Sequence, residues 1–181
     1  NIVHPEVGRL APYASDTKRD NDHLWMIGKI IEKEQQVPVW KPSAKPTVSL
    51  TGKYSVLDAS CGRGHLLRTL LAQGFRAQGT EISQYLILNE LKDLPVTRAT
   101  YDDIDCMGTK SFDIVISNDV LEHLLDEDMV NRAVRNLHKI SKKWLCISVG
   151  GDTAAKKYSQ ALALEMRGLH TFRREREWWR Q

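Results

Sequence analysis

The chain has 181 residues, of which 41% are hydrophobic and 27% are charged, and its net charge is +3. This length suits one compact domain, and the balanced composition excludes a largely disordered chain. No run reaches the roughly 18 consecutive apolar residues that a membrane-spanning helix needs, and residues 1–22 lack the apolar segment of a signal peptide.

Cysteine usage points to a reducing environment. Cys61, Cys106 and Cys146 are odd in number, lie far apart and show no paired spacing. A disulfide framework or a cysteine-based metal site is therefore not expected. We expect a cytoplasmic protein with no metal centre and no membrane association.

The first 52 residues are expected to form a helical arm followed by a linker. The polar residues 20–22 can cap a helix whose apolar side chains recur on one side. These side chains are Leu24, Ile27, Ile30 and Ile31. Three prolines between residues 38 and 46 then interrupt regular structure up to Gly52.

Residues 53–151 are expected to form the core, because strand and helix patterns alternate along them. Strands are predicted over residues 54–58, 75–82, 96–100, 112–117 and 144–149. Helices are predicted after a glycine turn near residue 64, over residues 83–92, and between the fourth and fifth strands. The last helix should turn six apolar side chains inward: Met129, Val130, Ala133, Val134, Leu137 and Ile140. This alternation predicts an α/β fold with a doubly wound, mainly parallel sheet and helices on both faces.

Residues 152–181 are expected to form a helical segment or lid, broken near residues 168–170. Trp178 and Trp179 close this segment, and Trp25 and Trp40 lie in the arm. These tryptophans either line a substrate pocket or pack the terminal segments onto the sheet, because large aromatic side chains serve both purposes.

The most informative stretch is the turn predicted between the first strand and the first helix. It reads Asp58-Ala59-Ser60-Cys61-Gly62-Arg63-Gly64, and Glu81 follows Gly62 by 19 residues at the end of the second strand. Small residues let a ligand approach the backbone, and the start of a helix offers free N–H groups. An acid ending the next strand can accept hydrogen bonds from both hydroxyls of a ribose.

Three interpretations of this turn are open at the level of single residues. A nicotinamide dinucleotide site prefers G-x-G-x-x-G, but Leu67 occupies the third glycine position. A carboxylate such as Asp58 facing a cationic amino-acid group fits the pattern better. The third interpretation is a turn of purely structural use.

Residues 54–151 resemble the class I S-adenosylmethionine-dependent methyltransferases, which have a Rossmann-like fold. Asp58, Gly62 and Gly64 match the family's first motif, Glu81 matches its ribose-binding acid, and FDIVISNDVLEHL over residues 112–124 is similar to its fourth motif. The resemblance implies S-adenosylmethionine as cofactor and assigns its binding residues. These are Asp58, Ser60, Gly62, Gly64, Glu81, Ile82, Tyr101, Asp102 and Asn118.

The chain departs from the family pattern in two ways. Ser60 stands where a glycine is usual, so its hydroxyl either donates to the cofactor or crowds it. The C-terminal pair of strands that family members carry is not apparent before Gln181. An open sheet edge favours association, so a homo-oligomer is possible.

The candidate catalytic residues are two histidines. His123 follows the fourth strand near the reactive end of the cofactor, and its titration range suits a general base. His170 lies in a predicted loop that can close over a substrate. Each of them can also serve local structure alone.

The resemblance implies an enzyme that transfers a methyl group to an oxygen or nitrogen of a small molecule. A nucleic-acid or nucleotide substrate is the second hypothesis, since basic residues gather after position 131, although they also fit a solvated helix face. Asn118-Asp119-Val120-Leu121 lacks the prolines and aromatic ring that clamp a flipped base, which argues against base methylation. The third hypothesis is a cofactor-binding partner subunit without catalysis.

Overall fold

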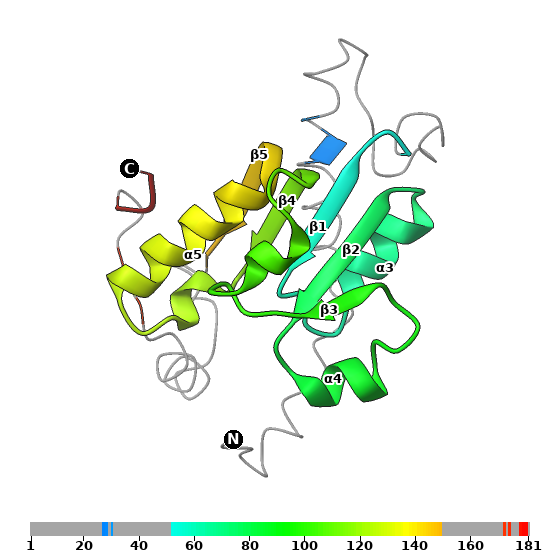
Figure 1. The fold of residues 1–181 in the computed structure, drawn as a ribbon, viewed down its shortest axis with the longest axis horizontal. Helices are drawn as coiled ribbons and strands as arrows, with labels where there is room; N and C mark the ends of the chain where they lie inside the picture. The colour runs from blue at the N-terminus through cyan, green and yellow to red at the C-terminus, as the bar shows by residue number, and fades with distance from the viewer. Residues whose placement is uncertain are drawn as a thin grey trace, which may run out of the picture.

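A computed structural model describes residues 52–149, together with Ile27, Gly28, Ile30, Phe172, Arg174 and residues 178–180. Its sheet has five strands: β1 (Ser55–Ala59), β2 (Arg76–Glu81), β3 (Val96–Arg98), β4 (Phe112–Asn118) and β5 (Ser141–Ser148). All pairings are parallel, and the order is β3-β2-β1-β4-β5 (Figure 1). From β1 the chain continues to β2 on one side of the sheet, and from β4 it continues to β5 on the other side. The strand order therefore reverses between β1 and β4, where ligands bind in folds of this kind.

Helices connect the strands. These are α3 (His65–Ala72), α4 (Gln84–Asn89) and α5 (Glu127–Ile140), with the 3₁₀ turns η2 (Ile104–Met107), η3 (Leu121–His123) and η5 (Trp178–Arg180). In Figure 1, α3 and α5 lie on opposite faces of the sheet. Each covers a separate apolar cluster, one containing Leu67 and Leu70, the other Leu137 and Ile140. The predicted doubly wound parallel fold, with helices on both faces, is confirmed.

The central strands are apolar in sequence because both of their sides are buried. In β1, Val56 joins the cluster under α3, while Leu57 and Ala59 join the cluster under α5. In β4, Ile114 and Val115 divide in the same way. A strand covered on both faces needs apolar side chains at successive positions, which explains the continuous apolar runs.

Local signals explain the main helix, α5. The Asp126 side chain accepts a hydrogen bond from Met129 N at 2.8 Å and so caps the first turn. Val130, Ala133, Leu137 and Ile140 are buried, at the helical spacing expected of them. The predicted Met129 and Val134 are half-buried at the border of this face.

Some boundaries differ from the prediction. β5 begins at Ser141 rather than residue 144, directly after α5, because the buried Ser141 pairs with Phe112. The sequence pattern does not predict this part of the strand, because the exposed Lys142 and Lys143 interrupt the apolar run. α4 spans only residues 84–89: Ser83 caps it, and no residue within it is buried.

Of the predicted arm, Ile27 and Ile30 are helical and buried in the cluster under α3. The other residues singled out in the arm, and His170, lie outside the described residues. The three-part division of the chain remains a prediction. In the described part of the chain, no helix has both the length and the apolar character needed to cross a bilayer.

Candidate functional site

The turn that joins β1 to α3 lies at the carboxyl edge of the sheet and has a left-handed backbone. The φ angles are 64° at Ser60, 54° at Gly62 and 74° at Gly64. The end of β2 anchors this turn: Cys61 N donates to Thr80 O at 2.8 Å, and Ser60 N donates to Thr80 Oγ1 at 3.1 Å. Ser60 therefore adopts a conformation that glycine takes more readily, which explains why glycine is usual there.

Glu81 holds the same turn from the next strand. Its side chain is 6% exposed. One carboxylate oxygen accepts from Gly62 N at 2.9 Å, and the other accepts from Ser83 N at 2.8 Å. A carboxylate has about four lone-pair sites, so both oxygens keep capacity for further donors such as ribose hydroxyls.

The two glycines of the turn serve different purposes. A Cβ at Gly64 would lie 2.7 Å from Leu94 Cδ1 and 2.8 Å from Leu91 Cδ2, so a side chain there would have to displace these two methyl groups. A Cβ at Gly62 would meet nothing within 4 Å. The side of the turn at Gly62 is thus open, and a ligand can approach its backbone there.

The surroundings of the turn combine buried acids with an exposed apolar side chain. Asp58 is 3% exposed at the end of β1, whereas Ile82, directly after Glu81, is 60% exposed. Burial, followed by the charges of Asp58 and Glu81, raises the pKa of the Cys61 thiol well above its usual value. The neutral thiol form of Cys61 is therefore favoured over the reactive thiolate.

Two predicted residues follow β3 and point to different places. Tyr101 is buried, with its hydroxyl 2.7 Å from Ser117 Oγ and 3.3 Å from the carbonyl oxygen of Ala59. Burial raises the pKa of Tyr101 to about 12, so the hydroxyl is protonated at neutral pH. Asp102 is exposed and lies 3.5 Å from Arg132 Nε of α5.

The end of β4 forms the other side of the site. Ser148 Oγ donates to Asn118 Oδ1 and, at 3.2 Å, to Asp119 Oδ1. Asp119 has a φ of 51° and donates its N–H to Ser148 O at 2.9 Å. His123 lies just beyond, exposed at the end of η3.

The structure thus gathers five of the predicted cofactor residues, Asp58, Ser60, Gly62, Gly64 and Glu81, in and around one turn. Asn118 ends the adjacent strand, β4. It lies beside the turn, because the preceding residue, Ser117, is the register partner of Ala59. Sequence reasoning missed Thr80 and Ser148. Neither carries a motif, and only strand pairing shows that they anchor the turn and the end of β4.

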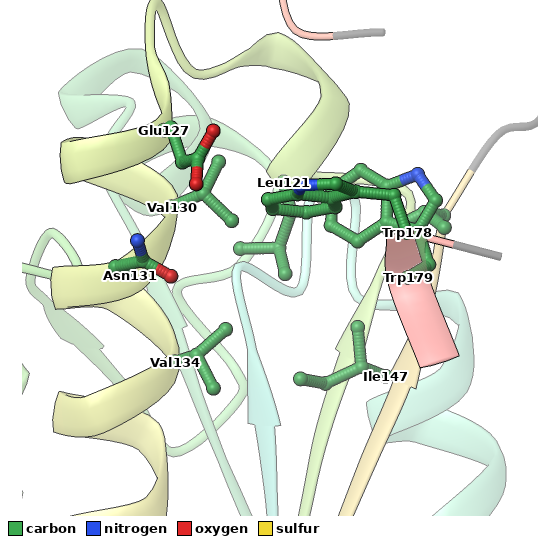
Figure 2. Close-up of a pocket in the computed structure, with 9 residues that line it drawn as sticks. Leu121, Glu127, Val130, Asn131, Val134, Ile147, Trp178 and Trp179 are labelled. Atoms are coloured by element: carbon green, nitrogen blue, oxygen red, sulfur yellow. The ribbon is translucent and has the colours of Figure 1, made fainter. Parts of the chain in front are cut away.

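A separate cavity of about 360 Å³ lies between α5, the end of β5 and η5. In Figure 2, Glu127, Val130, Asn131 and Val134 of α5 face Trp178 and Trp179 across it. None of the predicted cofactor residues lines this cavity. The cavity is therefore separate from the turn that carries the predicted cofactor residues.

Aromatic packing holds the tryptophan wall of the cavity. The rings of Trp178 and Trp179 are 5.0 Å apart and edge-to-face, and both contact Phe172 in the same manner. The Phe172 N–H donates to Glu122 O at 3.0 Å, which ties this cluster to η3. Trp178 and Trp179 pack onto the core and also line this cavity, and their role in a substrate pocket stays a prediction.

The basic residues of α5 are partly neutralised. Arg132 pairs with Asp102, and Lys139 Nζ lies 3.3 Å from Asp105 Oδ2. Among the described residues, no group of three or more His, Cys, Asp or Glu side chains is arranged to hold a metal ion.

Comparison with known proteins supplies the class. Residues 57–143 match the protein family described as Methyltransferase domain. A search of curated protein sequences found no significant match. The fold resembles an S-adenosylmethionine-dependent methyltransferase from Archaeoglobus fulgidus (TM-score 0.59, 17% identity, 86% of this chain and 64% of that one).

Two further solved structures share the fold. One is the plantazolicin methyltransferase BamL, solved with SAH and a triazolic desmethylPZN analog (TM-score 0.67, 15% identity, 91% of this chain and 60% of that one). The other is the sugar N-methyltransferase KedS8 from Streptoalloteichus (TM-score 0.54, 22% identity, 81% and 52%). The chain spans less than two thirds of the length of each of these three proteins.

The fold and the turn define a Rossmann-like domain of the class I methyltransferase type. Residues 57–143 of the chain match the methyltransferase domain family, and the solved structures share the fold. The resemblance stated from the sequence motifs is thereby confirmed.

Proposed function

We propose that this protein is an S-adenosylmethionine-dependent methyltransferase that acts on an oxygen or nitrogen of a small molecule. The observation that carries this proposal is the turn at Gly62. Its left-handed backbone is open on one side and is held by Glu81, the acid that ends the neighbouring strand. A cofactor with a ribose and an amino-acid tail suits this arrangement.

The residues present fit S-adenosylmethionine. The turn over residues 60–64 would hold the methionine part, with Asp58 as the carboxylate facing its ammonium group. Glu81 would accept the ribose hydroxyls, and the exposed Ile82 would pack on the adenine. When bound, the cofactor supplies an electrophilic methyl group on a sulfonium.

The protein's own contribution to such a transfer is orientation and exclusion of water. Positioning alone lowers the barrier of a reaction between two bound partners by roughly 7–11 kcal/mol. Asn118 ends the strand beside the turn, so this proposal places it near the reacting centre. His123, exposed one turn further along, is the candidate that accepts a proton from a hydroxyl or ammonium acceptor.

Three observations support a small acceptor. The cavity between α5 and η5 has a volume within the range of small-molecule sites and lies on the side of the carboxyl ends of β4 and β5. Arg132 and Lys139 are engaged by acids, which weakens the case for a nucleic-acid surface. Two proteins of similar fold are, by their titles, a plantazolicin methyltransferase and a sugar N-methyltransferase.

Calorimetric titration with S-adenosylmethionine and S-adenosylhomocysteine, with NAD as the comparison ligand, tests the cofactor. We expect micromolar binding of the first two and none of NAD. Binding of NAD alone would replace the proposal with an oxidoreductase. Cofactor binding with no methyl transfer to any of a broad panel of acceptors would favour a non-catalytic partner subunit.

Two variants test the proposed roles of Glu81 and His123. Glu81→Ala removes the carboxylate that holds both the turn and the ribose, so the affinity should fall by at least about tenfold, the loss of charge-assisted hydrogen bonds. His123→Ala should bind the cofactor normally and turn over more slowly once an acceptor is known. Normal affinity in Glu81→Ala would refute the placement of the cofactor.

A further inference from the structure

The hydroxyl of Tyr101 lies where β1 and β4 end. Two of its hydrogen-bond partners are Ser117 Oγ, at 2.7 Å, and the carbonyl oxygen of Ala59, at 3.3 Å, and the side chain of Ser60 also interacts with it. Ala59 and Ser117 are the last register partners of the two strands. One side chain therefore bridges the strands immediately before the chain leaves each of them.

The residues that follow these partners carry the unusual backbone of the site. Ser60 comes directly after Ala59 and has a φ of 64°, and Asp119 follows two residues after Ser117 with a φ of 51°. A non-glycine residue keeps a left-handed conformation only when its surroundings determine it. The Tyr101 hydroxyl contacts Ala59, which precedes Ser60, and Ser117, which lies two residues before Asp119.

The backbone of Tyr101 is held independently of its hydroxyl. Asn136 of α5 donates its side-chain amide to Tyr101 O at 2.8 Å. The residue thus connects α5 and the segment after β3 to the end of β1. Because the hydroxyl is buried and its bonds point to protein atoms, it is not directed at an open ligand surface.

We propose that Tyr101 is a positioning residue whose hydroxyl holds the turn over residues 60–64 in the shape that receives the cofactor. It acts through Ala59 and Ser117 rather than by touching the cofactor. This inference rests on the proposed function for the identity of the ligand, although the ordering of the turn can be measured without any ligand.

The chain contains a matched control at the opposite end of the same strand pair. Ser55 Oγ lies 2.7 Å from Asp113 Oδ2 and accepts a hydrogen bond from Asp113 N at 2.9 Å. This hydroxyl also bridges β1 and β4, but at their amino ends, away from the turn. Loss of the Ser55 hydroxyl or of the Tyr101 hydroxyl removes a bridge between β1 and β4. Only the bridge made by Tyr101 borders the site.

The experiment compares Tyr101→Phe, Ser117→Ala and Ser55→Ala in the full chain. In Tyr101→Phe and Ser117→Ala we expect S-adenosylhomocysteine to bind about 3- to 10-fold more weakly, the scale of one buried hydrogen bond. The double variant of Tyr101→Phe and Ser117→Ala should lose no more than Tyr101→Phe alone, because Ser117→Ala removes one of the bonds that Tyr101→Phe already removes. Ser55→Ala should lower the melting temperature without changing the affinity.

Hydrogen exchange in the cofactor-free protein gives a second readout. Amides of residues 60–64 should exchange faster in Tyr101→Phe than in the wild type or in Ser55→Ala. If the wild type binds no S-adenosylhomocysteine, the proposed function fails while this comparison still decides the role of Tyr101. Unchanged exchange of the turn, or equal effects of Tyr101→Phe and Ser55→Ala, would overturn the inference.

Discussion

At the scale of single residues, the turn after β1 shows how one motif combines packing with ligand access. Gly64 is enclosed by Leu91 and Leu94, whereas Gly62 borders open space although its backbone is also left-handed. The sequence motif alone suggests the same explanation for a glycine at both positions. The surroundings in the structure show different explanations, packing at Gly64 and open space at Gly62.

This difference predicts opposite effects of two identical substitutions. Gly62→Ala should cost about 1–2 kcal/mol of unfolding free energy, the strain of a left-handed alanine, while cofactor affinity falls strongly because the new methyl group occupies the open side. Gly64→Ala should destabilise the protein by more than this, because overpacking is added to the same strain. Urea unfolding and calorimetry measure the two quantities.

The contrary result for this pair is also informative. If Gly62→Ala loses stability but binds the cofactor as the wild type does, the ligand does not approach the turn from that side. Because a Cβ at Gly62 meets no other atom, the stability loss of Gly62→Ala reports the left-handed strain alone, and the excess loss of Gly64→Ala reports the overpacking.

At the scale of elements, α5 is stabilised by its cap as well as by its buried face. Asp126→Ala removes the bond to Met129 N and should lower the free energy of unfolding by about 0.5–2 kcal/mol. For a chain of this size, each kcal/mol corresponds to a fall of about 2–4 °C in Tm. Calorimetric melting measures this change.

Two further variants separate the cap from the charge. Asp126→Asn keeps a capping oxygen and should remain close to the wild type. Asp128→Ala removes an acid from the first turn of α5 without removing the cap, so it reports the interaction with the helix dipole alone. A loss in Asp128→Ala as large as that in Asp126→Ala would contradict the capping argument.

At the scale of the whole molecule, one sheet supports two apolar clusters. Leu67 lies in the cluster under α3 and Leu137 in the cluster under α5, and both are fully buried. Because β1 and β4 contribute side chains to both clusters, disruption of these two strands would expose both clusters at once.

We therefore expect Leu67→Ala and Leu137→Ala each to cost about 2–5 kcal/mol and to shift a single unfolding transition. Leu88→Ala is the control, since Leu88 is 61% exposed and its loss should stay within about 0.5 kcal/mol. Urea unfolding followed by fluorescence and by circular dichroism provides the test. Two separated transitions would show that the faces fold independently.

Association of the molecule remains a prediction. β5 pairs with β4, and the described residues place no strand on its other edge. The exposed Lys142 and Lys143 lie at the beginning of β5, and lysines on an edge strand oppose pairing with another chain. The open edge of β5 thus favours the homo-oligomer predicted from the sequence, whereas its two lysines oppose pairing along that edge.

The amino-acid sequence by itself determined the parallel doubly wound fold and the position of the turn. Apolar runs at β1 and β4 report strands buried on both faces, and small residues between Asp58 and Gly64 report a close turn at a helix start. These are local signals, because they depend on spacing within a few residues. For the same reason, the caps at Ser83 and Asp126 could be anticipated from residue type.

Only the tertiary structure decided what meets across the sheet. Thr80 and Ser148 anchor the two sides of the site, and Tyr101 joins the ends of β1 and β4, yet each lies some 16 to 42 positions from a hydrogen-bond partner. No local pattern encodes such contacts, because they depend on strand order and register. The first residues of β5 were hidden for the same reason, because the polar Lys142 and Lys143 lie at an irregularity of the register, between the paired Ser141 and Trp144.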